Sequence, residues 1–173
     1  MGRRGATRPF LAALSALALC ACGYGFTQRW VAKGGAERVH VRAFENLSTE
    51  PGLGVAVTSS LRSELARRGA EAGEGAAAAI EGEVRATEPV PTSQRAVTTA
   101  AGAPATEIAT WRIAVEVRAR LVQGGAKLGE HVVRREAAFL AGADPLETEG
   151  RRALALRQLA DEAAREVLRA FER

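Results

Sequence analysis

The chain has 173 residues, of which 47% are hydrophobic and 25% are charged, a composition typical of a globular protein with one ordinary core. Its formal net charge of +4 falls to +1 once the three arginines among the first eight residues are set aside, which excludes the strongly basic surface of a nucleic-acid-binding protein. Both cysteines lie within the first 22 residues, so the rest of the chain forms no disulfide and depends on packing for its stability.

The first residues have the order of a bacterial lipoprotein signal. A positively charged start precedes an apolar stretch from Phe10 to Leu19, which is shorter than the roughly 20 residues needed to span a bilayer. The stretch ends in Leu-Cys-Ala-Cys, with leucine at −3 and alanine at −1 relative to Cys22. We therefore predict cleavage before Cys22 and lipid on its thiol. Cys20 suits lipidation less well because Leu19 would stand at −1, and a plain secretory signal with two incidental cysteines is the alternative.

These assignments divide the chain into three parts. Residues 1–21 are the predicted signal peptide, and residues 22–36 are a lipid-anchored linker that contains aromatic residues and packs loosely. Residues 37–173 form a single domain of ordinary size. Several acyl chains hold a protein on a membrane far more firmly than one chain does, so lipid on Cys22 would fix the domain close to the bilayer.

The first predicted strand and helix follow the linker. From Val39 to Phe44, apolar and polar residues alternate with the period of two that is typical of a strand, and Val41 and Ala43 lie on its apolar side. Pro51 suits the first turn of a helix, because the amide hydrogen that it lacks would have no partner there. Leucine or valine then recurs every four residues up to Leu65, which predicts a helix with one buried stripe.

Three further strands are predicted, with one irregular segment among them. Alternation predicts strands over Ala78–Thr87 and Trp111–Val122. Residues 88–106 are rich in Thr, Ala, Pro, Ser and Gly and lack apolar periodicity, so we expect a long mobile loop, with frayed strand extensions at most. A fourth strand runs from Leu128 to Leu140. Its inward side is left open because two adjacent valines, at positions 132 and 133, occupy both sides, and a bulge is expected nearby.

The last segment, after Asp144-Pro145, has apolar residues at helical spacing, with glutamates near its start and arginines near its end, as the helix dipole favours. The order β-α-β-β-β-α predicts an α/β domain, an α+β two-layer sandwich with two helices packed on one face of a four-stranded mixed sheet. The opposite face is polar, either simply solvated or a contact surface for a partner protein. Its charged residues are Glu81, Glu83, Arg85, Arg112, Glu116, Arg118 and Arg120.

Two motifs point to a known family. Cys22-Gly23-Tyr24 stands directly after the predicted signal, and residues 39–53 read VHVRAFENLSTEPGL. In these motifs and in the spacing of the elements that follow, the chain resembles the LptE family of lipopolysaccharide-assembly lipoproteins, whose fold of two helices over a four-stranded sheet is similar to the predicted one. The resemblance implies a lipoprotein on the periplasmic side of the outer membrane. Such a protein plugs the LptD β-barrel, assists its assembly and takes part in lipopolysaccharide transport.

The resemblance also implies contact residues, because the family binds lipopolysaccharide through basic residues near strand tips. The residues in comparable places are Arg95, Lys127, Arg85 and Arg112. For each of them, an ordinary solvated cation is the alternative. The sheet surface that would face the polar interior of the barrel includes Glu83, Glu116, Arg118 and Arg120.

Enzymatic activity is not expected. His40 and His131 lie in predicted strands without a second ligand at metal-binding spacing, and no serine stands in a Gly-x-Ser-x-Gly motif. We therefore predict no catalytic residue, no metal, no nucleic-acid partner and no cofactor apart from the lipid on Cys22. The remaining alternative is a periplasmic lipoprotein that activates a peptidoglycan synthase or forms an interaction module like those of curli secretion or TolB. The long loop together with Cys22-Gly23-Tyr24 favours the LptE family.

Overall fold

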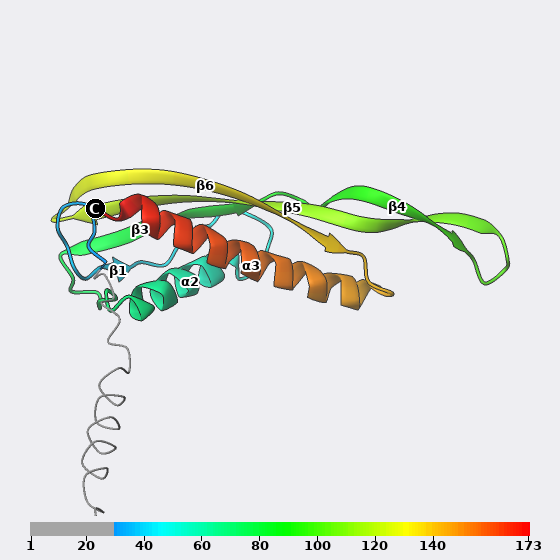
Figure 1. The fold of residues 1–173 in the computed structure, drawn as a ribbon, viewed down its shortest axis with the longest axis horizontal. Coiled ribbons are helices and arrows are strands. Elements are labelled where there is room, and N and C mark those ends of the chain that lie inside the picture. The colour runs from blue at the N-terminus through cyan, green and yellow to red at the C-terminus, as the bar shows by residue number, and fades with distance from the viewer. Residues whose placement is uncertain (1–29) are drawn as a thin grey trace, which may run out of the picture.

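The computed structural model describes residues 30–173; the predicted signal peptide, Cys22 and the linker up to residue 29 lie outside the described residues. Figure 1 shows a long, curled sheet with both helices on one face, and a two-stranded hairpin that reaches beyond them. The elements are β1 (His40–Val41), β2 (Glu45–Asn46), α2 (Leu53–Arg67), β3 (Ala78–Ala86), β4 (Val90–Thr98), β5 (Pro104–Gln123), β6 (Ala126–Leu140) and α3 (Pro145–Phe171). The predicted α+β class is confirmed.

The sheet is mixed, as predicted. β3, β5 and β6 form an antiparallel meander, and β1 and β2 run parallel to β3 because α2 carries the chain back across the sheet. β4 and β3 pair with the same edge of β5, the edge opposite β6. β4 pairs with the first half of β5, and β3 pairs with its second half. The sheet therefore differs from the predicted four strands in two respects: the first strand is interrupted, and β4 is an additional strand.

The interruption between β1 and β2 has a local cause. The Phe44 amide does not pair with β3 but donates a hydrogen bond of 3.0 Å to Oγ1 of Thr58 on α2. This contact shifts the alternation by one residue, so Phe44 is buried and Ala43 is exposed, the reverse of the prediction. Gly82 makes room for the Phe44 ring, because a β-carbon on Gly82 would lie 2.8 Å from Cε1 of the ring and 2.0 Å from the Arg118 carbonyl oxygen.

The core lies between the helices and the inner face of the sheet. The predicted stripe of α2, from Leu53 to Leu65 at every fourth residue, is fully enclosed. α3 adds a second buried stripe that ends at Phe171, and β3 and β5 contribute their alternate apolar residues, such as Ile80 and Val117. Val132 and Val133, where a bulge was expected, pair regularly with Arg118 and Val117; the register shift between β5 and β6 lies instead at Leu128, between Leu121 and Val122 of β5.

The expected loop over residues 88–106 is wrong in its conformation, because most of it forms β4 and the start of β5. The two strands pair from Val90 opposite Arg112 to Thr98 opposite Pro104. Pro91 lies at an irregularity of the ladder and Pro104 is the first residue of its strand, two positions where a missing amide hydrogen is tolerated. The segment shows no apolar alternation because β4 is exposed along nearly its whole length, so neither of its faces has a core to cover.

The last part of the expected linker over residues 22–36 belongs to the packed domain. Trp30 and Ala32 are fully buried, and Ala32 forms an isolated antiparallel bridge with Glu172. The Lys33 amide donates to the Phe171 carbonyl at 2.8 Å. The segment that begins at Trp30 is thus held against the C-terminal end of α3.

The start of α3 is held by a reciprocal pair of side-chain caps. Oδ1 of Asp144 accepts a 2.8 Å hydrogen bond from the Glu147 amide, and Oε2 of Glu147 accepts one of 2.6 Å from the Ala143 amide. The hydrogen bond from the Ala143 amide lowers the pKa of Glu147 below its ordinary value, and the hydrogen bond and charge of the Arg151 guanidinium lower it further. Pro145 stands at the first helical position, which suits a residue without an amide hydrogen.

This cap predicts a pH dependence of stability. A carboxylate whose pKa is lower in the folded protein stabilises it above the unfolded pKa, and that contribution is lost as the pH falls through the folded pKa. The free energy of unfolding should therefore decrease as the pH is lowered from about 5 to about 3, and Glu147→Gln should make the decrease shallower. Urea unfolding at a series of pH values measures both slopes. Parallel curves for the two proteins would contradict the assignment.

Candidate functional site

The outer face of the sheet, which points away from the helices, carries a ladder of opposite charges. Glu83 lies opposite Arg118, and Glu116 lies between Arg85 on β3 and Arg134 on β6. Opposite charges at facing positions of neighbouring strands stabilise a sheet, whereas like charges there destabilise it. The four residues predicted to face a barrel, Glu83, Glu116, Arg118 and Arg120, all belong to this ladder.

Glu130 is the centre of the ladder at its β6 side. Its carboxylate accepts a 2.9 Å hydrogen bond from Nζ of Lys127 and lies 3.8 Å from Nε of Arg120 and 3.9 Å from Nε of Arg118. The hydrogen bond from Lys127 and the charges of the two arginines lower the pKa of Glu130 below its ordinary value. The face therefore presents alternating charges that largely compensate one another, rather than a patch of one sign.

The four candidate lipopolysaccharide contacts do not converge on one site. Arg95 lies in the hairpin, opposite Glu107, and Lys127 lies at the other end of the sheet, opposite Val122. Their β5 partners are fifteen residues apart, a distance of up to about 50 Å along a strand. Arg85 and Arg112 lie between these ends. The structure thus places them as separate positions along the long axis of the sheet.

The hairpin of β4 and the first part of β5 is the most exposed part of the fold. β6 ends at Leu140, opposite Thr110, so β5 pairs only with β4 before that point. One cross-strand ion pair, Arg95 to Glu107 at 3.3 Å, joins its two strands. A two-stranded ribbon with no buried face is only marginally stable by itself, and its unpaired strand edges are ready contact surfaces. Figure 1 shows this ribbon projecting beyond α3.

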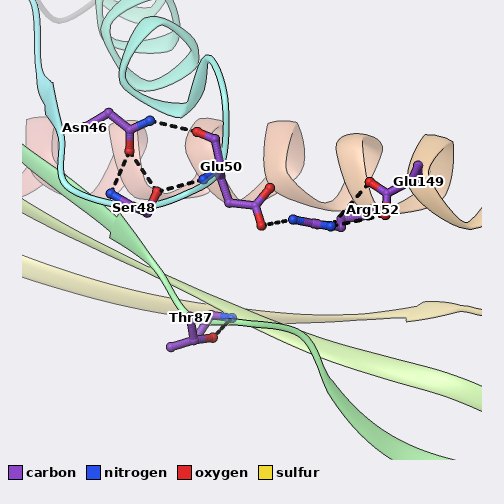
Figure 2. A network of polar contacts seen from close by, with 7 residues as sticks. Asn46, Ser48, Glu50, Thr87, Glu149 and Arg152 are labelled. Atoms are coloured by element: carbon purple, nitrogen blue, oxygen red, sulfur yellow. Dashed lines mark hydrogen bonds and ion pairs between the residues drawn. The ribbon is translucent and has the colours of Figure 1, made fainter.

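The loop between β2 and α2 holds a second polar site, drawn in Figure 2. Oδ1 of Asn46 accepts hydrogen bonds from the Ser48 amide at 3.1 Å and the Ser48 hydroxyl at 2.7 Å, and its Nδ2 donates to the Glu50 carbonyl at 2.7 Å. An asparagine that bonds the backbone of the next residues in this way replaces the hydrogen bonds of a regular turn. The loop is therefore fixed, and it directs the Glu50 side chain towards α3.

Glu50 forms a buried ion pair with Arg152 of α3 (Figure 2). Glu50 is 5% exposed, and Glu149 accepts a second contact from Arg152, at 3.1 Å to its Nη1. Burial works against the charge of the Arg152 guanidinium, but the hydrogen bond and charge of Glu50, aided by Glu149, outweigh it and raise the pKa of Arg152 above its ordinary value. The pair ties the loop to the first half of α3.

A cavity of about 370 Å³ opens beside this ion pair, between α3 and the inner face of the sheet. Its sheet side has a cross-strand aromatic pair, Trp111 opposite Phe139. The lining residues are Thr49, Glu50, Glu88, Pro89, Trp111, Phe139, Thr148, Glu149 and Arg152. This is the end of the core from which the hairpin departs, and the sequence did not point to it, because its residues come from five separate segments.

Comparison with known proteins now identifies the family. The model of the LptE family of lipopolysaccharide-assembly proteins matches residues 36–171. The chain belongs to the LptE family. It is therefore a lipopolysaccharide-assembly lipoprotein and not an enzyme. The sequence has no match among curated proteins.

The solved structures similar to this LptE-family chain include bacterial lipoproteins. Rare lipoprotein B from Shewanella oneidensis has a TM-score of 0.50 at 12% identity, with 76% of this chain and 92% of that chain covered. A protein from Xanthomonas campestris has a TM-score of 0.50 at 12% identity, covering 76% and 81%. A minor lipoprotein from Acinetobacter baumannii has a TM-score of 0.47 at 13% identity, covering 82% and 92%. At these identities the first two likenesses concern the fold alone.

The family requires no cofactor, and residues 30–173 contain no group of three or more His, Cys, Asp or Glu side chains placed to hold a metal ion. His40, one of the two histidines, has its Nδ1 3.3 Å from the Ala72 carbonyl oxygen, which is a structural contact. Within the same part of the chain, no helix has both the length and the apolar character needed to cross a membrane.

Proposed function

We propose that this LptE-family chain is an outer-membrane lipoprotein, anchored on the periplasmic side by lipid on Cys22, that occupies the lumen of an LptD-type β-barrel. There it assists the assembly of the barrel and takes part in lipopolysaccharide transport to the cell surface. The observation that carries the proposal is the charge ladder on the outer sheet face, because the interior of a large outer-membrane barrel is polar. The family membership supports the same function.

The ladder suits a polar protein surface better than it suits a charged ligand. Its arginines and glutamates already form pairs, such as Arg118 with both Glu83 and Glu130, so little net charge is left to attract a distant polyanion. Paired charges that stay half-exposed can exchange partners with polar groups on an opposing wall. Electrostatic complementarity of this kind fixes register and specificity more than it adds affinity.

The hairpin supports the proposal in a different way. A thin ribbon without a buried face gains order when a surrounding wall covers it, and its small Thr, Ser and Ala side chains fit a polar lumen. In this arrangement Arg95 contacts lipopolysaccharide from within the ribbon, whereas Lys127 contacts it at the opposite end of the sheet. Arg85 and Arg112 would lie along the path between them.

The test is recovery of the barrel with the tagged protein. The wild type should co-purify with a large outer-membrane barrel, and the double substitution Arg118→Glu/Arg120→Glu should reduce recovery at least about tenfold, since like charges would then face Glu83 and Glu130 across the sheet. The matched control, Arg157→Glu, changes an exposed residue of α3 and should leave recovery unchanged. Circular dichroism establishes that each variant is folded. Recovery of the protein alone, with normal surface lipopolysaccharide after its depletion, would overturn the proposal.

A further inference from the structure

The sheet has a step where β6 ends. β6 ends at Leu140, opposite Thr110 of β5, and the Ala141 amide still donates a hydrogen bond of 3.0 Å to the Ala109 carbonyl. β5 extends beyond this point to Pro104, paired only with β4 on its other edge. Figure 1 shows β6 stopping short of the hairpin tip, where the chain turns back into α3. This edge of β5 therefore has no neighbouring strand, within the described part of the chain, on the far side of Ala109.

Two residues on this edge leave their backbone groups without partners among residues 30–173. In an antiparallel strand, successive residues direct their amide and carbonyl groups to alternate edges. The Ala109 carbonyl points to the β6 side, and the Thr110 carbonyl points to β4, where it accepts a 3.3 Å hydrogen bond from the Thr92 hydroxyl. Ala105 and Glu107 therefore direct their backbone groups to the open edge. A bare edge of this kind is a template for another strand.

Two exposed leucines lie at the step. Leu140, the last residue of β6, is 60% exposed, and Leu146, in the first turn of α3, is 83% exposed. The connection between them is short and is folded against α3, because the Gly142 amide donates to the Thr148 hydroxyl at 2.9 Å. Both leucines are thus held near the end of the open edge. Exposed apolar side chains beside an unpaired strand indicate a contact surface.

We propose that an extended segment of a partner protein adds to this edge as a strand antiparallel to β5, in line with β6. Its backbone pairs with Ala105 and Glu107, and an apolar side chain near its first residue covers Leu140 and Leu146. The direction follows from this part of the sheet, where β4 and β6 both run antiparallel to β5. The unpaired groups repeat at every second residue, about 7 Å apart, a spacing that an extended peptide matches. A third strand also gives the ribbon the stability that two strands lack.

Two other occupants fit the edge less well. The predicted N-terminal segment has eight residues from Cys22 to the start of the domain at Trp30, a reach of at most about 28 Å. Trp30 is bonded to Leu168, which lies about 33 Å along α3 from Leu146, so this segment does not reach the step. In an antiparallel pairing of two copies, the hairpin tip of one copy would meet the step of the other. The tip, residues 99–103, has no side chain larger than threonine to cover the leucines.

The inference rests on the proposed function only for the identity of the partner, which would be the barrel. The binding experiment uses a peptide and no barrel, so the two proposals fail separately. Absence of peptide binding with normal barrel recovery would overturn the strand addition alone. Peptide binding by a wild type that recovers no barrel would overturn the plug role alone.

The probe is the capped hexapeptide acetyl-Leu-Thr-Val-Thr-Ser-Thr-amide, whose leucine meets the step, together with a version that has alanine in place of leucine. Each peptide is titrated into the purified ¹⁵N-labelled protein, and the backbone amide resonances are followed. The amides of Ala105 and Glu107 should shift saturably and gain protection from exchange. Those of Val97 and Arg95, opposite them on β4, point to the far edge of the ribbon and should do neither. The alanine peptide should bind at least about fivefold more weakly.

Two pairs of variants sharpen the result. Ala105→Pro removes an amide from the open edge, whereas Val97→Pro, at the opposite position on β4, removes one from the far edge. The first should weaken binding of the leucine peptide at least about fivefold, and the second should leave it within about twofold. Leu146→Ser should abolish the preference for the leucine peptide. Leu154→Ser, at another exposed leucine of α3, is the control and should keep it.

Unmoved Ala105 and Glu107 amides, equal effects of the two prolines, or an undiminished preference in Leu146→Ser would each overturn the inference. Shifts of the same amides that depend on protein concentration alone would overturn it in favour of pairing between two copies. For the barrel as the partner, Ala105→Pro should lower barrel recovery and Val97→Pro should not. Equal recovery with both variants would overturn the barrel as the partner and leave the plug role intact.

Discussion

Replacement of Trp30 by alanine is expected to lower the free energy of unfolding by about 3–5 kcal/mol, the range typical of truncating a buried aromatic residue. The Trp30 side chain is 1% exposed, and its indole N–H donates a 3.2 Å hydrogen bond to the Leu168 carbonyl. The substitution removes the apolar contacts of the ring and this hydrogen bond together. It also weakens the attachment of residues 30–36 to the C-terminal end of α3.

Urea unfolding followed by circular dichroism measures this loss. Trp111→Ala serves as the control, because it deletes the same atoms from a ring that is only half-buried, beside a cavity. It should cost clearly less than Trp30→Ala, since less apolar area returns to water. Equal losses for the two variants would show that Trp30 does not hold the domain together as its burial indicates.

Trp30 also illustrates why the domain boundary was predicted too late in the chain. The residues around it have no helical or strand period, and so they resemble a linker. What fixes them is a set of contacts with residues more than 130 positions away, including the bond from the Trp30 indole to Leu168. Periodicity reports on neighbours along the chain, and it carries no information about such distant pairing.

The elements with one buried face were predicted well. α2 buries Leu53, Val57, Leu61 and Leu65, as their spacing predicted, because the helix lies on the sheet along one side only. The hairpin was missed for the complementary reason, since β4 is exposed nearly throughout and has no apolar side to reveal it. A strand without a core to cover leaves β-branched residues and turn residues as its only signals, and these also occur in loops.

The charged face was predicted from the alternation in β3 and β5, but its central residue, Glu130, was not predicted. Glu130 lies in β6, whose alternation is obscured by the bulge opposite Leu121 and by the adjacent valines Val132 and Val133. Glu50 and Arg152 were missed because their partnership joins a loop to a helix 102 residues later. The signal that could have pointed to Glu50 is its place in the motif over residues 39–53, which marked the loop without revealing its partner.

Replacement of Arg152 by alanine is expected to destabilise the domain by about 3–5 kcal/mol, because it leaves a buried carboxylate without its partner. Glu50 is 5% exposed, and the loop that carries it is fixed by the Asn46 hydrogen bonds, so its backbone is held at the buried position that faces Arg152. The loop from Asn46 to Glu50 should lose its protection from amide exchange in this variant. Urea unfolding and hydrogen exchange measure the two effects.

The buried charge, and not the lost side chain, should account for most of that destabilisation. Glu50→Gln in the Arg152→Ala background should therefore recover part of the stability, since a neutral amide costs less to bury than a carboxylate. Arg134→Ala is the control, because it breaks the exposed ion pair with Glu136, at 3.3 Å, and should cost at most about 1 kcal/mol. If Arg152→Ala cost no more than Arg134→Ala, Glu50 would be reaching water through the adjacent cavity, and the ion pair would not be the element that holds the loop on α3.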